Sequence, residues 1–203
     1  MDRRRLVELK IAMEFGIAPD GDTLPKATKH EVGQPQLLIS RFGEESAVFF
    51  RYDLDSDERA ELRALGPETL MTDEARVRAI LDPHHPTTRV YRMRWYTFDR
   101  VPDQSEYPDV TIQDDRHVIV IDGEVVAWAQ TDTDHEDAAE VEIETHPDYR
   151  RRGFARQVTA SWAAATLAAG KVAFYSHLLE NTASQAVAAS LGLTHLSDEV
   201  EYV

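Results

Sequence analysis

Hydrophobic and polar positions form their clearest pattern in the second half of the chain. Apolar runs over 117–121 and 125–130 predict two strands, and Asp122-Gly123 between them is a strong signal for a tight hairpin turn. Apolar residues alternate with acidic ones over 140–146, which predicts a third strand with one apolar and one acidic face. The remaining elements predicted there are a helix over 154–169, a strand over 172–177, a helix over 182–190 and one or two strands over 193–202.

The first half of the chain has a weaker pattern. Apolar residues at helical spacing predict a helix over 2–15, and two strand-like runs over 36–42 and 47–52 predict a hairpin. The other elements predicted there are a polar loop over 18–35, a helix over 55–65 ended by Gly66-Pro67, a helix to Leu81 with Thr72 as its N-cap, a strand over 90–98 and a connector over 100–110.

After residue 115 the predicted elements follow the order βββαβαβ. Three consecutive strands joined by short turns favour an antiparallel meander, and strands joined through a helix favour crossover connections. The expected fold class is therefore α/β (α+β), with a mixed sheet that has helices on its faces.

The stretch from Glu140 to Ala155 contains the strongest candidate site. Pro147 ends the predicted strand because proline cannot donate a ladder hydrogen bond. Three arginines and Gly153 then lead into the helix. The first N–H groups of a helix have no intrahelical partner and the helix dipole is positive there, so this turn suits an anion such as a phosphate. Arginines at this position oppose the dipole, and a bound anion would account for them.

Two motifs in this half resemble those of the GNAT superfamily of N-acetyltransferases. The family's pyrophosphate signature is Arg/Gln-x-x-Gly-x-Gly/Ala, which Arg150, Gly153 and Ala155 match. The family's preceding Pro-x-Tyr is matched by Pro147 and Tyr149. A second family pattern follows at the expected distance, with Asn181-Thr-Ala-Ser184 and then Leu191-Gly192-Leu193. The resemblance covers about residues 116–203.

The resemblance implies a fold and a cofactor. A GNAT sheet is mixed and mostly antiparallel, has helices on both faces, and is splayed between its fourth and fifth strands, where the pantetheine arm of acetyl-CoA enters. Here that opening would lie between 140–146 and 172–177. Residues 111–203 would form the acetyl-CoA-binding core, and residues 1–110 would pack on the same sheet and shape the acceptor site. The residues implied to contact the coenzyme are Glu144, Thr145, Arg150, Arg151, Arg152, Gly153, Phe154, Ala155, Asn181 and Ser184.

Acetyl transfer requires the acceptor amine to be neutral, so a carboxylate, or a water that it holds, must accept a proton. The resemblance places a glutamate base on the strand over 140–146, and Glu140 and Glu142 are equal candidates for it. A backbone N–H near Glu144 or Thr145 would polarise the thioester carbonyl, as the resemblance implies.

The family's usual proton donor is missing from its position. Many members have a tyrosine seven residues after the asparagine, which protonates the departing thiolate, but Ala188 stands there in this chain. The side chains that remain as substitutes are Tyr175, His177, Ser184 and Tyr202. We include His177 with Glu140 and Glu142 among the candidate catalytic residues.

Composition narrows the functional classes. The chain has 203 residues and a formal net charge of -15, which argues against nucleic-acid and anionic-membrane surfaces because phosphates would be repelled. There is no cysteine, hence no thiol nucleophile, disulfide framework or thiolate metal site, and we expect no metal cofactor. No segment is apolar for long enough to cross a membrane and no signal peptide is recognisable, so a cytoplasmic protein is expected. The sequence leaves a homodimer open.

These observations favour one function and leave one rival. The favoured function is transfer of an acetyl group from acetyl-CoA to a primary amine, on a small molecule or a peptide, by direct attack. The rival is a non-catalytic module of GNAT-like fold that binds coenzyme A and acts in regulation or interaction. A nucleotide site of the P-loop type is disfavoured because no lysine follows Gly153.

Overall fold

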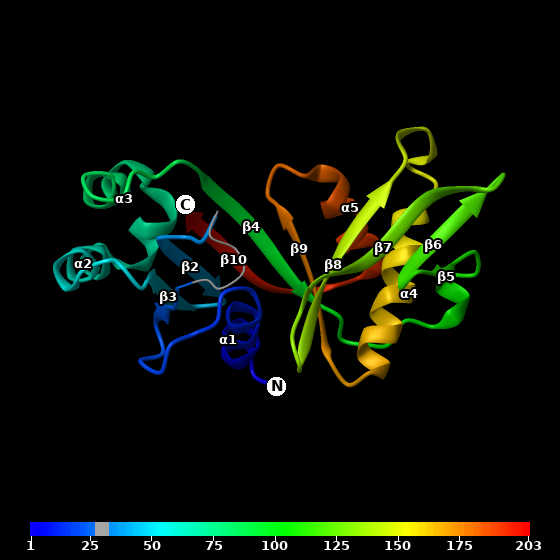
Figure 1. The fold of residues 1–203 in the computed structure, drawn as a ribbon, viewed down its shortest axis with the longest axis horizontal. Helices are drawn as coiled ribbons and strands as arrows, with labels where there is room; N and C mark the ends of the chain where they lie inside the picture. Colours follow the sequence, from blue (N-terminus) through cyan, green and yellow to red (C-terminus); the bar gives the residue numbers. More distant parts are fainter. Residues whose placement is uncertain (27–32) are drawn as a thin grey trace. The chain divides into compact units, whose positions relative to one another are not determined.

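The computed structural model describes residues 1–26 and 33–203, which fall into two units (Figure 1). The first unit contains Met1–Arg94 and Leu196–Val203, and the second contains Trp95–His195. The predicted division at residue 110 therefore differs from the division by contacts, which falls after Arg94 and returns the last eight residues to the first unit. Part of the predicted loop over 18–35 lies outside the described residues.

The second unit is built on an antiparallel meander. Its strands β5 (Thr111–Gln113), β6 (Arg116–Ile121), β7 (Glu124–Asp134) and β8 (Ala138–Thr145) pair in that order. Asp122 and Gly123 both have positive φ, of 52° and 85°, which is the conformation of the predicted tight hairpin turn. Strand β9 (Val172–Leu178) then pairs with β8 in parallel, after the crossover helix α4 (Phe154–Ala168).

Strands β8 and β9 stay together only at one end. Their pairing joins residues 138–140 to residues 172–174, although both strands continue beyond it to Thr145 and Leu178. Figure 1 shows the two strands separating past this point. The splayed strand pair is therefore confirmed, and backbone groups on one side of β8 beyond Glu140 lack a strand partner in the described chain.

Helix α4 packs against this sheet through an apolar face. Val158 and Trp162 are buried in a cluster with apolar residues of β6, β7, β8 and β9. The indole N–H of Trp162 donates to Thr131 Oγ1 at 3.0 Å, so its one polar atom is satisfied. The short helix α5 (Thr182–Leu191) follows β9 and adds Ala188 to the same cluster.

The first unit has its own core and contains one part of the ten-stranded sheet. Its strands lie in the order β1 (Thr23–Leu24), β3 (Glu45–Arg51), β2 (Leu37–Phe42), β10 (Thr194–Tyr202) and β4 (Val90–Thr97), and the last two also contribute residues to the second unit. The helices are α1 (Arg3–Glu14), α2 (Ser56–Thr72) and α3 (Glu74–Leu81). The two units together confirm a mixed, mostly antiparallel α/β fold.

The predicted break at Gly66-Pro67 is confirmed: Gly66 has a non-helical φ of 75°, and Pro67 starts a new helical turn that continues to Thr72. One prediction of local structure was wrong. Asp73, not Thr72, caps the next helix, because its side chain accepts from the N–H of Arg76. Strand β5 follows the predicted connector over 100–110, in a stretch for which the sequence predicted no element.

No helix in the part of the chain that the structure describes is long and apolar enough to cross a membrane.

Candidate functional site

The turn between β8 and α4 exposes a row of backbone donors. After the 3₁₀ turn Pro147–Tyr149, Arg151 and Gly153 adopt positive φ values of 61° and 81°. Gly153 is the N-cap of α4 and supplies no side-chain cap. Within residues 1–26 and 33–203, the N–H groups of residues 151–156 donate to no acceptor. Unused N–H groups at the positive end of a helix form an anion site.

The three arginines of this turn carry charge that no carboxylate of the described chain neutralises. Arg150 Nε donates to the carbonyl of Thr145 at 3.2 Å, and Arg152 Nη2 donates to that of Asp148 at 3.2 Å. Arg152 also lies over the ring of Tyr149, with its guanidinium carbon 4.8 Å from the ring centroid. These contacts orient two of the guanidinium groups while all three side chains stay exposed. The turn is therefore preorganised for a ligand of opposite charge.

A fourth arginine holds the start of α4 in place, and no motif in the sequence pointed to it. Arg156 Nη2 lies 2.8 Å from Glu106 Oε2, and its Nε donates to the carbonyl of Ser190 at 3.2 Å. Glu106 also pairs with Arg100 at 2.5 Å. The hydrogen bond from Arg100 is the largest cause that lowers the pKa of Glu106 to about 2. This network ties the first turn of α4 to the end of α5 and to the loop before β5.

Asn181 and Ser184 lie at the start of α5. Asn181 Oδ1 accepts from the N–H of Ser184 at 3.1 Å and so caps the helix. The carbonyl of Ser184 accepts from the hydroxyl of Tyr175 at 3.0 Å, and burial raises the pKa of Tyr175 to about 12. Ala188 is buried under the same helix with 2% of its surface exposed.

The two candidate bases differ in environment. Glu140 is 8% exposed, and its Oε1 accepts from the Ser176 hydroxyl at 2.6 Å. Glu142 is exposed, and its Oε2 accepts from Gln130 Nε2 at 2.6 Å. Ser176 stands on β9, so Glu140 lies where β8 and β9 begin to separate. Glu144, two residues further along β8, is exposed, whereas the hydroxyl oxygen of Thr145 is buried with no partner among the described residues.

His177 has a tyrosine neighbour that the sequence did not connect to it. His177 is buried, and its Nδ1 lies 2.8 Å from the carbonyl of Leu178, which requires Nδ1 to carry the proton. Its Nε2 therefore accepts from the hydroxyl of Tyr96 at 3.3 Å. Tyr96 is 81 residues away in the chain, so no local pattern could have paired the two.

Tyr202, the remaining candidate proton donor, belongs to the first unit. Its ring is fully buried in the first unit, where its hydroxyl donates to the carbonyl of Leu70 at 3.0 Å. Burial raises its pKa to about 12. These features indicate a role in the core of that unit.

Comparison with known proteins agrees with this geometry. The family model of the GNAT acetyltransferases matches residues 117–200. An acetyltransferase from the GNAT family of Colwellia psychrerythraea aligns over 100% of this chain and 97% of its own, with 12% identity and a TM-score of 0.53. A GNAT-family protein from Novosphingobium aromaticivorans aligns over 58% of this chain and 67% of its own, with 21% identity and a TM-score of 0.49. No curated protein matches the sequence.

Proposed function

Because residues 117–200 match the family model of the GNAT acetyltransferases, we propose that this protein is an N-acyltransferase that transfers an acetyl group from acetyl-CoA to a primary amine. The observation that supports this most is the turn at the start of α4. There, unused backbone donors and three arginines without carboxylate partners in the described chain lie directly after the strand that separates from its neighbour. A pyrophosphate bound at the turn and an acyl arm between β8 and β9 would satisfy both features.

The pyrophosphate would be held by N–H groups from about Arg151 to Ala155, with the three arginine side chains adding charge. The thioester arm would lie along β8 beyond Glu140, where backbone groups lack a strand partner in the described chain. An N–H near Glu144 or Thr145 would donate to the thioester oxygen as negative charge develops on it. Asn181 and Ser184 would contact the arm from the start of α5.

The reaction would proceed by direct attack. The neutral amine nitrogen bonds to the thioester carbon, the carbon–sulfur bond breaks, and the thiolate leaves with the electron pair. One amine proton passes to Glu140 or Glu142, and a proton from His177, a neighbouring group or water neutralises the thiolate. We favour neither glutamate from chemistry alone: Glu140 is buried beside the strand opening, whereas Glu142 is open to solvent.

Calorimetric titration with acetyl-CoA and, separately, with ATP tests the proposal first. We expect acetyl-CoA to bind and ATP to bind far more weakly. Turnover would then be sought with a panel of amines, detecting the free thiol. Glu140→Gln and Glu142→Gln should bind acetyl-CoA normally, and at least one should lose turnover by about 100-fold or more. If both variants and their combination kept full turnover, neither glutamate would be the base.

A second candidate is a coenzyme A-binding module without catalysis. The buried Ala188, in the position of the usual tyrosine, favours it. Binding of acetyl-CoA with no turnover across the amine panel is the result expected for such a module. Absence of acetyl-CoA binding would contradict both candidates.

A further inference from the structure

A buried histidine and two tyrosines border the opening between β8 and β9. Beyond Phe174, the last residue paired with β8, strand β9 continues through Tyr175 and His177, which are both buried. Tyr96 stands on β4, the strand on the other side of β9 in the sheet. Its ring centroid lies 6.3 Å from that of Tyr175 and 5.5 Å from that of His177. All three residues belong to the second unit, and Tyr96 is only half-buried.

The hydroxyl of Tyr96 is held by a weak hydrogen bond. It donates to His177 Nε2 at 3.3 Å, because the proton of neutral His177 is on Nδ1 and points to the carbonyl of Leu178. A separation of 3.3 Å is long for a bond from a hydroxyl. Hydrogen bonds to a charged acceptor are shorter and stronger. The Tyr96 hydroxyl can therefore exchange its neutral partner for an anion that forms beside it.

The neighbouring polar groups have no mobile proton to offer. The hydroxyl of Tyr175 donates to the carbonyl of Ser184 at 3.0 Å, and burial raises the pKa of Tyr175 to about 12. The one proton of neutral His177 is engaged by a backbone carbonyl. The side chain of Ser184 is an aliphatic hydroxyl, which is a far weaker acid than a phenol. Helix α5 contributes Ala188 to the core cluster against which Tyr96 packs, and alanine has no polar side-chain atom.

The two faces of the sheet separate this group from the candidate bases. Ser176 shares its face with Glu140, because the hydroxyl of Ser176 donates to the Glu140 carboxylate at 2.6 Å. Successive side chains of a strand point to opposite faces, so Tyr175 and His177 project to the other face. Tyr96 contacts both of them and therefore lies on that other face too. A proton acceptor on one face and a proton donor on the other suit direct attack, in which the entering amine and the leaving thiolate are joined to the same carbon from different sides.

We propose that Tyr96 is the catalytic residue that protonates the departing thiolate, and that His177 is a positioning residue for its hydroxyl. The inference rests on the proposed function. When the carbon–sulfur bond breaks, its electron pair stays on sulfur and takes the hydroxyl proton of Tyr96, which forms the S–H bond. Tyr96 then regains a proton from water, and the base releases the amine proton to water. The step therefore balances without a further reactant.

Turnover of Tyr96→Phe with two acyl donors tests the proposal. One donor is acetyl-CoA, and the other is its analogue with selenium in place of the thioester sulfur, whose selenolate leaves without a proton at neutral pH. With acetyl-CoA, kcat should fall by about 100-fold, while the affinity for acetyl-CoA measured by calorimetry stays within about threefold. With the selenium donor, variant and wild type should differ by less than about threefold. His177→Gln should lose about 10-fold with acetyl-CoA and recover in the same way.

Tyr107→Phe is the matched control. Tyr107 is a half-buried tyrosine of the same unit, and its hydroxyl makes no hydrogen bond within the described chain. This variant should behave as the wild type with both donors.

Equal kcat values of wild type and Tyr96→Phe with acetyl-CoA would overturn the proposal. A loss of the same size with both donors would also overturn it, because that pattern indicates a packing role. Both results leave the proposed function intact, whereas a wild type that acetylates no amine with either donor would overturn the proposed function and this inference together. If Tyr96→Phe failed to fold, a ring-fluorinated tyrosine in place of Tyr96 would decide, because it keeps the hydroxyl and makes it more acidic. An unchanged kcat with acetyl-CoA would then overturn the proposal.

Discussion

Replacing Gly153 with aspartate should remove coenzyme A binding without unfolding the protein. Gly153 has a φ of 81°, so any side chain there adopts a left-handed conformation, which costs about 1–2 kcal/mol. A Cβ added at this position would meet no atom within 4 Å, so no steric cost adds to the strain. A stable domain tolerates a loss of that size.

The effect on binding is electrostatic. A carboxylate about 5 Å from one phosphate, at an effective dielectric constant of about 40, is repelled by about 1.7 kcal/mol. Two phosphates near the turn bring the penalty to about 3 kcal/mol, which corresponds to a loss of affinity on the order of 100-fold. The three arginines reduce this penalty by screening, and added salt should reduce it further.

Calorimetric titration with coenzyme A measures the effect, and Gly153→Ala is the matched control. Alanine introduces the same backbone strain and no charge, so the two variants should melt at similar temperatures and differ in affinity. Coulomb repulsion predicts that the affinity of Gly153→Asp for coenzyme A is roughly 100-fold lower than that of Gly153→Ala. If the two affinities differed by less than about threefold, the assignment of the pyrophosphate to this turn would be refuted.

Three other predictions concern stability, each measured by urea unfolding. Glu201 binds a proton in the folded state at pH values where the unfolded chain has lost it. The free energy of unfolding of the wild type should therefore fall as the pH rises above about 4.5, by up to about 1.4 kcal/mol per pH unit. Glu201→Gln should flatten this pH dependence in the presence of EDTA. Glu106 has a pKa lowered to about 2, so its contribution of about 1 kcal/mol should be present above about pH 4.5 and disappear as the pH falls toward 2, and Glu106→Gln should lack it. Asn181→Ala should cost about 1 kcal/mol because it removes the cap of α5.

Each of these predictions has a contradicting result. An unchanged pH dependence in Glu201→Gln would mean that this carboxyl is ionised in the folded protein. Equal acid sensitivity of wild type and Glu106→Gln would mean that the ion pairs with Arg100 and Arg156 contribute nothing measurable. Full stability of Asn181→Ala would mean that water caps the helix equally well.

Local features of the fold were predictable where backbone chemistry alone decides them. The hairpin at Asp122-Gly123 needed only two residues that accept positive φ, and the break at Gly66 was placed correctly. Prediction failed where two neighbouring residues compete for one role. Thr72 and Asp73 are both good N-caps, but Thr72 is the last residue of the preceding helix and its hydroxyl donates to the carbonyl of Glu68, which leaves Asp73 as the cap of the next helix.

The candidate site divides in the same way. The anion-binding turn was identifiable because Arg150 to Ala155 are contiguous, and strand, turn and helix follow one another within a single segment. The partners of the candidate catalytic residues were not identifiable. Ser176 and Glu140 are hydrogen-bonded but lie 36 residues apart in the sequence, and Tyr96 and His177 lie 81 residues apart. Both contacts depend on the register between two strands, which the sequence of one strand does not specify.

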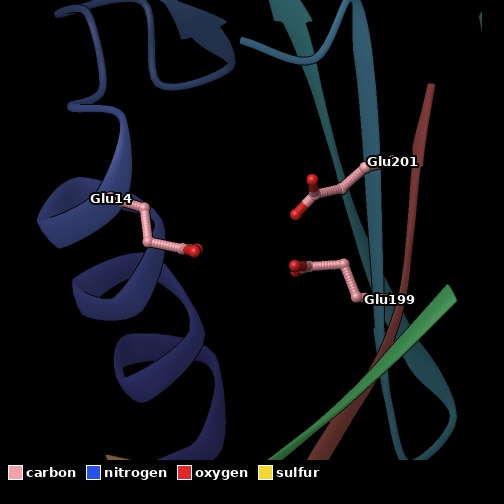
Figure 2. A group of neighbouring side chains, drawn as sticks. All are labelled: Glu14, Glu199 and Glu201. Atoms are coloured by element: carbon pink, nitrogen blue, oxygen red, sulfur yellow. The ribbon is translucent and has the colours of Figure 1, made fainter. Parts of the chain in front are cut away.

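By itself the sequence determined the order of elements after residue 115, the basic turn and the family resemblance, because these depend on residue periodicity and on chemistry within a few positions of the chain. Only the tertiary structure brought Lys10 and Glu14 of the first helix against Glu199 and Glu201 of the last strand (Figure 2). Lys10 and Glu199 lie 189 residues apart in the sequence. In the sequence these are ordinary charged residues near the two ends. Their significance comes from burial, because an ionised group in the core must find a partner, whereas the same group in water needs none.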